Sequence, residues 1–428
     1  MRADRMLAIL LMLSGIVSAD EPSDRISRVA QTEGLIAFWD FSLTKDGTWS
    51  SYRDEQTVDR AYPVFLRRIG DPKAYRPDEW PYEDERSKLT VDMSGPFGNA
   101  IRFDQGHIFA EVPRKEFDET PLDVCGRRPF TLIAWAKFVG KRHLVAGIWD
   151  EGGWDKYGGR RQIALFGGLF GSKSVIGHIS ATGASSYPQS TISGSQYARC
   201  RAIDGQGFAN DQWVALAMTF DPDRDEVIVY TNGAATPTNI TDPVARDVFR
   251  PEKPIASNPY HFPWSIYSPR SFVLKYNGYN VEKSGVYEHW LEIDTGSGRL
   301  TYRRSCPEGA EVPSHFRVTF NVEREGQRLL PESLVFAVAD DASVELPVKL
   351  VAGDRVVTSL HVREGEEWQR VGSEIRYGIR EGAPFTFGRA LGLGDEPIDH
   401  GTQLCIDGVA VFDRVLSGEE LKGLSFCE

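Results

Sequence analysis

A histidine and a serine lie two positions apart, a spacing that would place a general base and a nucleophile on the same face of a strand. His178 and Ser180 lie two positions apart in a strand-like segment that leads into a polar loop, and residues two apart on a strand share a face. A catalytic base also needs a third group to orient it, and the chain has no Gly-x-Ser-x-Gly nucleophile turn. We therefore predict ligand contacts, not catalysis, at His178 and at Tyr187 in the following loop, since loops at strand ends often bind ligands.

The densest aromatic cluster of the chain begins at Tyr260 and His261 and continues through Trp264. Flat rings with a polar group can stack on sugar faces or anchor a protein partner. The same side chains can instead pack one folding unit against another, because aromatic residues dominate such contacts as well. Both roles remain open, and we take Tyr260, His261 and Trp264 as candidate ligand-binding residues.

Paired carboxylates would indicate a polysaccharide-cleaving enzyme. Retaining glycosidases place two Asp or Glu side chains about 5 Å apart across the scissile bond. The nearest pair here is Glu292 and Asp294, and Gly296 indicates that a turn follows. A hairpin exposed to solvent accounts for these acids better than an active site does, so no catalytic residue is predicted.

The first nineteen residues have the three parts of a secretory signal. Two arginines precede an apolar run over residues 6–17, and small residues precede Asp20. This run is shorter than the ~18 apolar residues that cross a bilayer. We expect residues 1–19 to be a signal peptide, and the mature protein to be secreted, extracellular or periplasmic, with no membrane span.

The cysteines are widely spaced and contain no Cys-x-x-Cys pair, so the spacing of a structural zinc site is missing. In an oxidising compartment up to two disulfides could form, and Cys405 with Cys427 is a possible pair. Five free thiols are an equally good reading, because a chain of this size does not need disulfides to fold.

Charge and composition narrow the class of protein. The net charge is −12, from 61 acidic against 49 basic residues, which argues against nucleic acid as a partner. The 41 Gly, 24 Pro and 11% aromatic residues suit a turn-rich β protein. A chain of 428 residues exceeds the roughly 250 to 300 at which one core stops growing, so we expect two folding units or one large embellished domain.

Alternating apolar residues predict antiparallel strands along most of the chain. In the segment 213–220, Val214, Leu216, Met218 and Phe220 share one face, which we expect to meet the core. The small-residue face of this segment should lie under a second layer or near a groove. Residues 42–98 are polar and Pro-rich, which indicates an extended loop. Ser417 and Glu420 form a capping box that predicts a short closing helix. The main predicted strands are 34–41, 100–103, 107–112, 130–138, 213–220, 226–233 and 403–412.

The sequence pattern changes between residues 265 and 383, where short predicted strands follow one another at near-regular spacing. This pattern is typical of a second sandwich or barrel. The strand at 403–412 needs partners from before residue 240, so the stretch is predicted to be an insertion. Its predicted strands are 317–322, 333–338, 344–350, 356–362 and 374–379.

The order of the outer segments resembles the laminin-G-like, concanavalin A-like lectin and glucanase family. The resemblance implies a jelly-roll β-sandwich over residues 34–264 and 384–428, after a linker over 20–33, with the inserted β-rich unit over 265–383. It rests on Gly34-Leu-Ile-Ala-Phe-Trp-Asp-Phe41, Gly98-Asn-Ala-Ile-Arg-Phe-Asp-Gln105, Phe130-Thr-Leu-Ile-Ala-Trp135, Trp213-Val-Ala-Leu-Ala-Met-Thr-Phe-Asp221 and Asp407-Gly-Val-Ala-Val-Phe412.

The same resemblance implies a structural calcium ion held by Asp40 and Asp407. Two acids fall short of the six to eight oxygen ligands that calcium takes. Hydrogen bonds from these carboxylates to nearby backbone are therefore the other reading.

The sequence favours an exported, non-catalytic recognition protein that binds a carbohydrate or an extracellular protein. A polysaccharide-active hydrolase or lyase, with catalytic groups in the 42–98 loop or in the insertion, is the first alternative. A structural surface component is the second. Fold alone does not choose among them.

Overall fold

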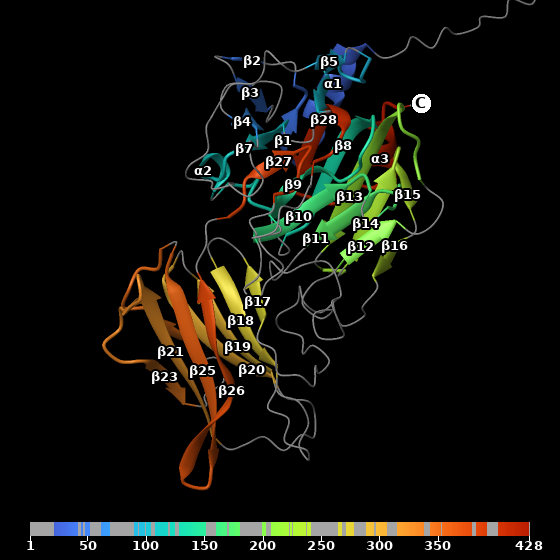
Figure 1. Ribbon diagram of the computed structural model, residues 1–428. Helices are drawn as coiled ribbons and strands as arrows, with labels where there is room; N and C mark the ends of the chain where they lie inside the picture. Colours follow the sequence, from blue (N-terminus) through green and yellow to red (C-terminus); the bar gives the residue numbers. More distant parts are fainter. Residues whose placement is uncertain are drawn as a thin grey trace, which may run out of the picture.

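A computed structural model describes most of the chain between residues 21 and 427 (Figure 1). The part that it describes consists mainly of antiparallel strands with three short helices, which confirms the predicted all-β sandwich with a short C-terminal helix. The described residues are 21–41, 44–45, 48–51, 61–68, 90–92, 94–98, 100–103, 108–118, 120–124, 128–150, 160–168, 171–179, 199–202, 207–221, 223–224, 226–236, 238–240, 264–267, 271–277, 288–294, 297–305, 315–337, 343–351, 353–378, 382–391 and 401–427.

One sheet has eight strands, in the order β15-β14-β13-β8-β28-β6-β5, with β1 also paired to β28. The pairing of β28 with β8 confirms that the last strand finds its partners before residue 240. The predicted hairpin after residue 213 is confirmed by the pairing of β13 with β14. The strands are β1 (Leu35–Trp39), β5 (Thr90–Asp92), β6 (Ala100–Phe103), β8 (Phe130–Phe138), β13 (Trp213–Asp221), β14 (Glu226–Thr231), β15 (Ala234–Thr236) and β28 (Leu404–Phe412).

A second sheet has ten strands, in the order β16-β12-β11-β10-β9-β27-β7-β4-β3-β2. The short strand β27 joins β9 to β7 at its centre. The strands are β2 (Thr44–Lys45), β3 (Thr48–Ser51), β4 (Ala61–Arg68), β7 (Ile108–Val112), β9 (Leu144–Asp150), β10 (Arg160–Phe166), β11 (Ile176–Ile179), β12 (Arg199–Ala202), β16 (Thr238–Ile240) and β27 (Phe385–Phe387).

The main hydrophobic core contains side chains from both of these sheets. The bulky face of β13 lies in it as predicted, with Val214, Leu216, Met218 and Phe220 all buried. Trp39 is fully buried, donates its indole N–H to the Tyr62 carbonyl oxygen at 3.0 Å, and has the Phe385 ring at 5.2 Å. Large aromatic side chains of this kind supply much of a core's buried apolar area.

A separate layer covers part of the outer face of the eight-stranded sheet. Ala215 and Ala217, on the small-residue face of β13, pack in a cluster with Leu421 and Leu424, which confirms the predicted second layer. Trp135 anchors this layer, because its indole N–H donates to the carbonyl oxygens of Leu424 at 2.8 Å and Ser425 at 3.0 Å. Small residues on a strand allow a covering segment to approach closely.

The described helices are α1 (Pro22–Ala30), α2 (Arg114–Phe117) and α3 (Gly418–Gly423). The predicted capping box of α3 is confirmed, since Ser417 and Glu420 bond to each other's backbone N–H groups. Helix α1 buries Val29 and Ala30 and was not predicted from the sequence. No helix in the described part is long and apolar enough to cross a membrane.

The prediction of an extended loop over residues 42–98 is wrong in part, because four strands lie there. Strand β4 pairs with β7, and Tyr62, Val64 and Leu66 extend into the main core. These three residues do alternate in the sequence, but polar and charged segments surround them, and the pattern was too short to stand out.

Two five-stranded sheets, β17-β18-β19-β20-β24 and β22-β21-β25-β26 with β23 on β21, enclose a second core (Figure 1). The predicted strand over 344–350 is wrong beyond residue 345, where Pro347 lacks the N–H that a ladder needs. The strands are β17 (Trp264–Tyr267), β18 (Ser271–Asn277), β19 (Glu288–Asp294), β20 (Arg299–Ser305), β21 (Phe316–Arg324), β22 (Gln327–Arg328), β23 (Leu334–Ala337), β24 (Ser343–Glu345), β25 (Arg355–Glu364) and β26 (Glu367–Gly378).

We predict that Val64→Ala lowers the free energy of unfolding by about 2 kcal/mol, because it removes two buried methyl groups and leaves a small cavity. Val335→Ala, at a position 54% exposed, is the matched control and should change stability by less than about 0.5 kcal/mol. Urea unfolding followed by tryptophan fluorescence measures both. Equal effects of the two substitutions would contradict the assignment of β4 to the core.

The pH dependence of stability should reveal the bond between Arg414 and Glu420. This hydrogen bond, 2.5 Å from Nη2 to Oε1, lowers the pKa of Glu420 from 4.5 to about 2. A carboxyl with a depressed pKa in the folded state stabilises the fold above pH 4.5 and loses that contribution as the pH falls toward 2. Glu420→Gln should therefore be less stable than the natural protein at pH 7, and thermal unfolding should show the gap closing in acid. A constant gap would rule out this linkage.

Candidate functional site

A row of polar and aromatic side chains crosses four strands on the outer face of the eight-stranded sheet. The register pairs Trp213 with Lys137, Lys137 with Cys405, and Cys405 with Arg102. Their strand neighbours Val214, Phe138, Leu404 and Ile101 lie in the main core. Because side chains alternate along a strand, the four residues of the row point away from that core.

Asp92 and Ser94 hold the end of this row together. The Lys137 ammonium forms an ion pair with the Asp92 carboxylate and donates to Ser94 Oγ at 3.2 Å. Ser94 Oγ donates to Asp92 Oδ1 at 2.6 Å and accepts the Trp213 indole N–H at 3.2 Å. We call Trp213, Lys137, Asp92, Ser94 and Cys405 the Trp213 surface.

These contacts shift the pKa values of Asp92 and Cys405 in the Trp213 surface. Burial alone would raise the pKa of Asp92, but hydrogen bonds from Lys137 and Ser94 outweigh it and hold that pKa well below its usual range. Burial and the nearby Asp92 charge raise the pKa of the Cys405 thiol to about 11. The thiol therefore stays protonated, and Lys137, bound to a carboxylate, is not available as a base for Ser94.

The ring of Trp213 is held in place and only partly covered. The Lys137 Nζ atom lies 5.2 Å from the ring centroid, and Ser94 fixes the indole N–H. The side chains of Lys137 and Asp92 keep 17% and 22% of their area exposed. This is an immobilised aromatic group at the protein surface, which can contact a ligand without first losing rotamer freedom.

The outer face of the ten-stranded sheet carries a different row. The register runs from Glu111 through Thr386, Gly147 and Ala164 to His178. The predicted ligand residue His178 is only 4% exposed, and its ring lies 5.0 Å from Phe166 and 5.6 Å from Trp149. The structure thus places His178 inside a packed aromatic cluster.

Glu111, at the other end of this row, is the described carboxylate that comes closest to a general acid, because a general acid needs a raised pKa. Burial raises its pKa, although the neighbouring Arg67 works in the opposite direction. Arg67 Nε donates to Glu111 Oε1 at 2.8 Å, and both side chains are nearly buried. A carboxylate held by an arginine in this way is an ion pair, which limits its use as an acid or nucleophile.

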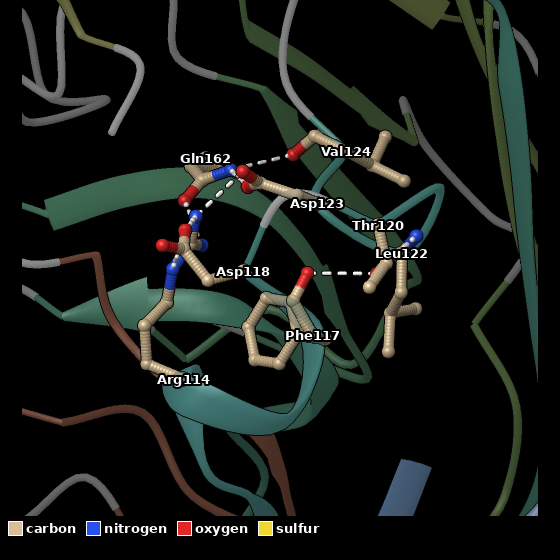
Figure 2. A network of polar contacts seen from close by, with 8 residues as sticks. All are labelled: Arg114, Phe117, Asp118, Thr120, Leu122, Asp123, Val124 and Gln162. Atoms are coloured by element: carbon tan, nitrogen blue, oxygen red, sulfur yellow. Dashed lines mark hydrogen bonds and ion pairs between the residues drawn. The ribbon is translucent and has the colours of Figure 1, made fainter. Parts of the chain in front are cut away.

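A further polar network ties α2 to β10 beside this row, and Figure 2 shows it. Arg114 binds Asp118 at 2.7 Å and Asp123 at 2.5 Å, and also donates to Gln162 Oε1 at 3.2 Å. Gln162 in turn donates to Asp123 at 3.0 Å and to the Val124 carbonyl oxygen at 2.8 Å. Burial works against the charge on Arg114, but the two carboxylates raise its pKa. The network fixes the chain after α2 against the sheet.

The two predicted calcium ligands are both buried. Asp40 follows β1, and Asp407 lies in β28, which pairs with β1. Asp407 Oδ2 accepts hydrogen bonds from the backbone N–H groups of Phe97 and Gly98, the latter at 3.1 Å. Gly95 permits this approach, since a Cβ atom there would lie 2.2 Å from Asp407 Oδ2. Backbone donors thus compensate the burial of Asp407.

No group of three or more His, Cys, Asp or Glu side chains that could hold a metal ion occurs among the described residues. The N–H groups of Phe97 and Gly98 already occupy Oδ2 of Asp407, which leaves fewer of its lone pairs for a calcium ion. The calcium site at Asp40 and Asp407 stays a prediction.

The possible disulfide between Cys405 and Cys427 is wrong, because both thiols are free. Cys405 lies in the Trp213 surface beside Asp92, whereas Cys427 packs with the layer over Trp135. Burial raises the pKa of Cys427 to about 12. Cys405 and Cys427 are close in the sequence, but strand β28 and the C-terminal segment place them in different surroundings.

The remaining predicted residues are not brought together with these features. Trp264 lies in β17, where only its backbone is described. Tyr187, Tyr260 and His261, like residues 1–20 with the predicted signal peptide, lie outside the described residues. Sequence reasoning missed the Trp213 surface, because Asp92 and Lys137 are 45 positions apart and share no motif.

Comparison with known proteins assigns no family. No protein-family model matches the chain, and no curated protein does. Among solved structures, Trypanosoma rangeli sialidase in complex with sialic acid has a TM-score of 0.35 and 9% identity, over 95% of this chain and 37% of that chain. Its complex with 2,3-difluorosialic acid scores 0.34 at 10% identity, over 95% and 37%. This chain therefore spans little more than a third of those enzymes, and TM-scores this low carry no argument about function.

We predict that Asp407→Ala lowers the free energy of unfolding by about 2 kcal/mol, because the buried N–H of Phe97 and the partly buried N–H of Gly98 lose their acceptor. The measurement is thermal and urea unfolding of both proteins in EDTA and in millimolar CaCl2. If Asp407 serves the backbone alone, calcium shifts neither protein. A calcium-dependent rise in the midpoint of the natural protein, absent in the variant, would instead support the calcium site.

Proposed function

We propose that this protein is an exported, non-catalytic recognition protein that binds a glycan through the Trp213 surface. The observation that carries the proposal is the part-exposed Trp213 ring, held by Ser94 at 3.2 Å and by Lys137 over its face. Aromatic rings bind the apolar face of a sugar ring, and an immobilised ring does so at a lower entropic cost.

The polar groups around the ring suit this role. Among the described residues, Asp92 and Ser94 take two of the three N–H donors of the Lys137 ammonium, and the third can donate to a sugar oxygen. Asp92 is ionised at neutral pH and keeps Lys137 in place. A neutral or weakly acidic sugar fits this arrangement, in which one cation and one anion lie side by side.

The pairing of the described carboxylates supports recognition over catalysis. Glu111 binds Arg67, Asp123 binds Arg114, and Asp92 binds Lys137. A glycosidase instead needs one carboxyl to give up a proton and a second to act as base or nucleophile. Among the described carboxylates, Glu111, whose pKa is raised, comes nearest to the general acid of a polysaccharide-active enzyme. A structural surface component, the third reading, would bind no sugar at all.

We predict that Trp213→Ala weakens binding to the cognate glycan roughly five- to tenfold, since a ring contact contributes on the order of 1–1.5 kcal/mol. A glycan array identifies the ligand for the natural protein, and calorimetry then measures both affinities. Trp213→Phe keeps a ring and should lose less affinity.

Phe65→Ala is the matched control, because it removes a part-exposed aromatic ring from β4, outside the Trp213 surface. It should leave the glycan affinity unchanged. The proposal fails if the natural protein binds no glycan on the array, or if the Trp213 and Phe65 substitutions weaken binding equally. Binding of a protein ligand in the absence of any glycan would favour protein recognition.

A further inference from the structure

Basic side chains gather on one face of the second unit, on the sheet that contains β21, β25 and β26. The register places Arg317, His361 and Arg370 side by side across these three strands. Arg363 lies opposite Trp368 at the next position on the same face. We call these five residues the Arg317 surface.

This face points away from the second core. Phe316 and Val318 flank Arg317 and lie in that core, as do Leu360 and Val362 on either side of His361. Alternation along the strands therefore turns the basic residues outward. Arg363 and Arg370 are exposed, and Arg317, His361 and Trp368 are partly exposed.

The positive charges are close enough to act together. Neighbouring strands lie ~4.8 Å apart, so the row across three strands spans roughly 10 Å. Burial lowers the pKa of His361, and the charges of Arg317 and Arg370 lower it further. The Arg317 guanidinium lies 4.7 Å from the centroid of the Trp368 ring. A planar cation stacked on an aromatic ring keeps its N–H edge free for an anion.

One donor of this cluster is not used. Arg317 Nε is buried and has no hydrogen-bond partner in the part of the chain that the structure describes. A buried donor without an acceptor costs the fold free energy, so, among the described residues, Arg317 is not held here by an internal carboxylate that would neutralise its charge. Glu367, next to Trp368 on β26, belongs to the opposite face by strand alternation, so its charge does not cancel the row.

We propose that the Arg317 surface binds an anionic polysaccharide through its carboxylate or sulfate groups. Arginine side chains present paired N–H donors that match the oxygens of such groups. The aromatic edge of Trp368 offers a contact for a sugar ring. The site goes beyond the proposed function, because it lies in a different unit and selects for charge rather than for a neutral sugar face.

The size of the surface and the charge of the protein favour a polysaccharide over nucleic acid. Specific protein–DNA interfaces bury on the order of 1,000 Å² or more, whereas this row crosses only three strands. The chain as a whole carries a net charge of −12, which would repel a long, densely charged nucleic acid. A flexible chain with fewer charges per unit length can engage the basic face alone.

The test uses the full-length mature protein and three probes: dextran sulfate, polygalacturonate and neutral dextran. We expect binding to at least one of the two polyanions in 150 mM salt and none to dextran. Arg363→Gln with Arg370→Gln should weaken that binding at least about tenfold, because it removes two charge-assisted contacts at exposed positions. Preference for one polyanion distinguishes carboxylate from sulfate groups.

Arg299→Gln with Arg328→Gln is the matched control, since it makes the same charge change at two exposed positions of the same unit. It should alter the affinity less than about twofold, as expected for screened surface charges. Trp213→Ala should leave polyanion binding intact, which separates this site from the glycan site. Three outcomes would overturn the proposal: no polyanion binding, equal losses in the two double variants, or equal binding to a DNA duplex.

Discussion

The described structure depends on one strand pairing between distant parts of the chain. Strand β28 lies between β8 and β6 in the eight-stranded sheet and also pairs with β1. Its apolar side chains Leu404, Ile406, Val409 and Val411 complete the main core. The sandwich forms only when residues 404–412 pair with strands that precede the second unit in the sequence. Bringing these distant segments together costs loop-closure entropy, which the burial of apolar area must offset.

The layer that follows β28 decides which part of the sheet is accessible. Residues after the last strand form α3 and then bind the Trp135 indole N–H through Leu424 and Ser425. This layer covers Ala215 and Ala217 but leaves Trp213, two positions earlier on β13, partly exposed. The Trp213 surface therefore exists at the margin of a packed layer, where a large ring is fixed by its neighbours and still reaches solvent.

Charge is organised differently in the ion pairs of the sandwich and on the Arg317 surface of the second unit. In the sandwich, Arg67, Arg114 and Lys137 each bind a carboxylate, and these pairs hold side chains in place. Buried pairs of this kind contribute more to a defined geometry than to net stability, because desolvation offsets much of their attraction. In the second unit, Arg317, Arg363 and Arg370 share one face with His361. Like charges that lie together cost free energy unless an anion compensates them, which is why this face is the stronger sign of an external ligand.

The sequence by itself determined the strands with the strongest apolar alternation and the closing helix. Alternating apolar residues predicted β8, β13, β14 and β28, and Ser417 with Glu420 predicted the capping box of α3. Signals of this kind lie within a few consecutive residues, where side-chain direction and backbone hydrogen bonding are local. The short alternation of Tyr62, Val64 and Leu66 was lost among polar neighbours, although it enters the core. The resemblance to the laminin-G-like family and the calcium site remain predictions.

Only the tertiary structure decided that Asp92 meets Lys137 and Trp213, that Arg317 lies beside His361, and that Cys405 and Cys427 stay apart. Those contacts join strands through register and packing, which depend on the whole sheet and leave no pattern in the residues that make them.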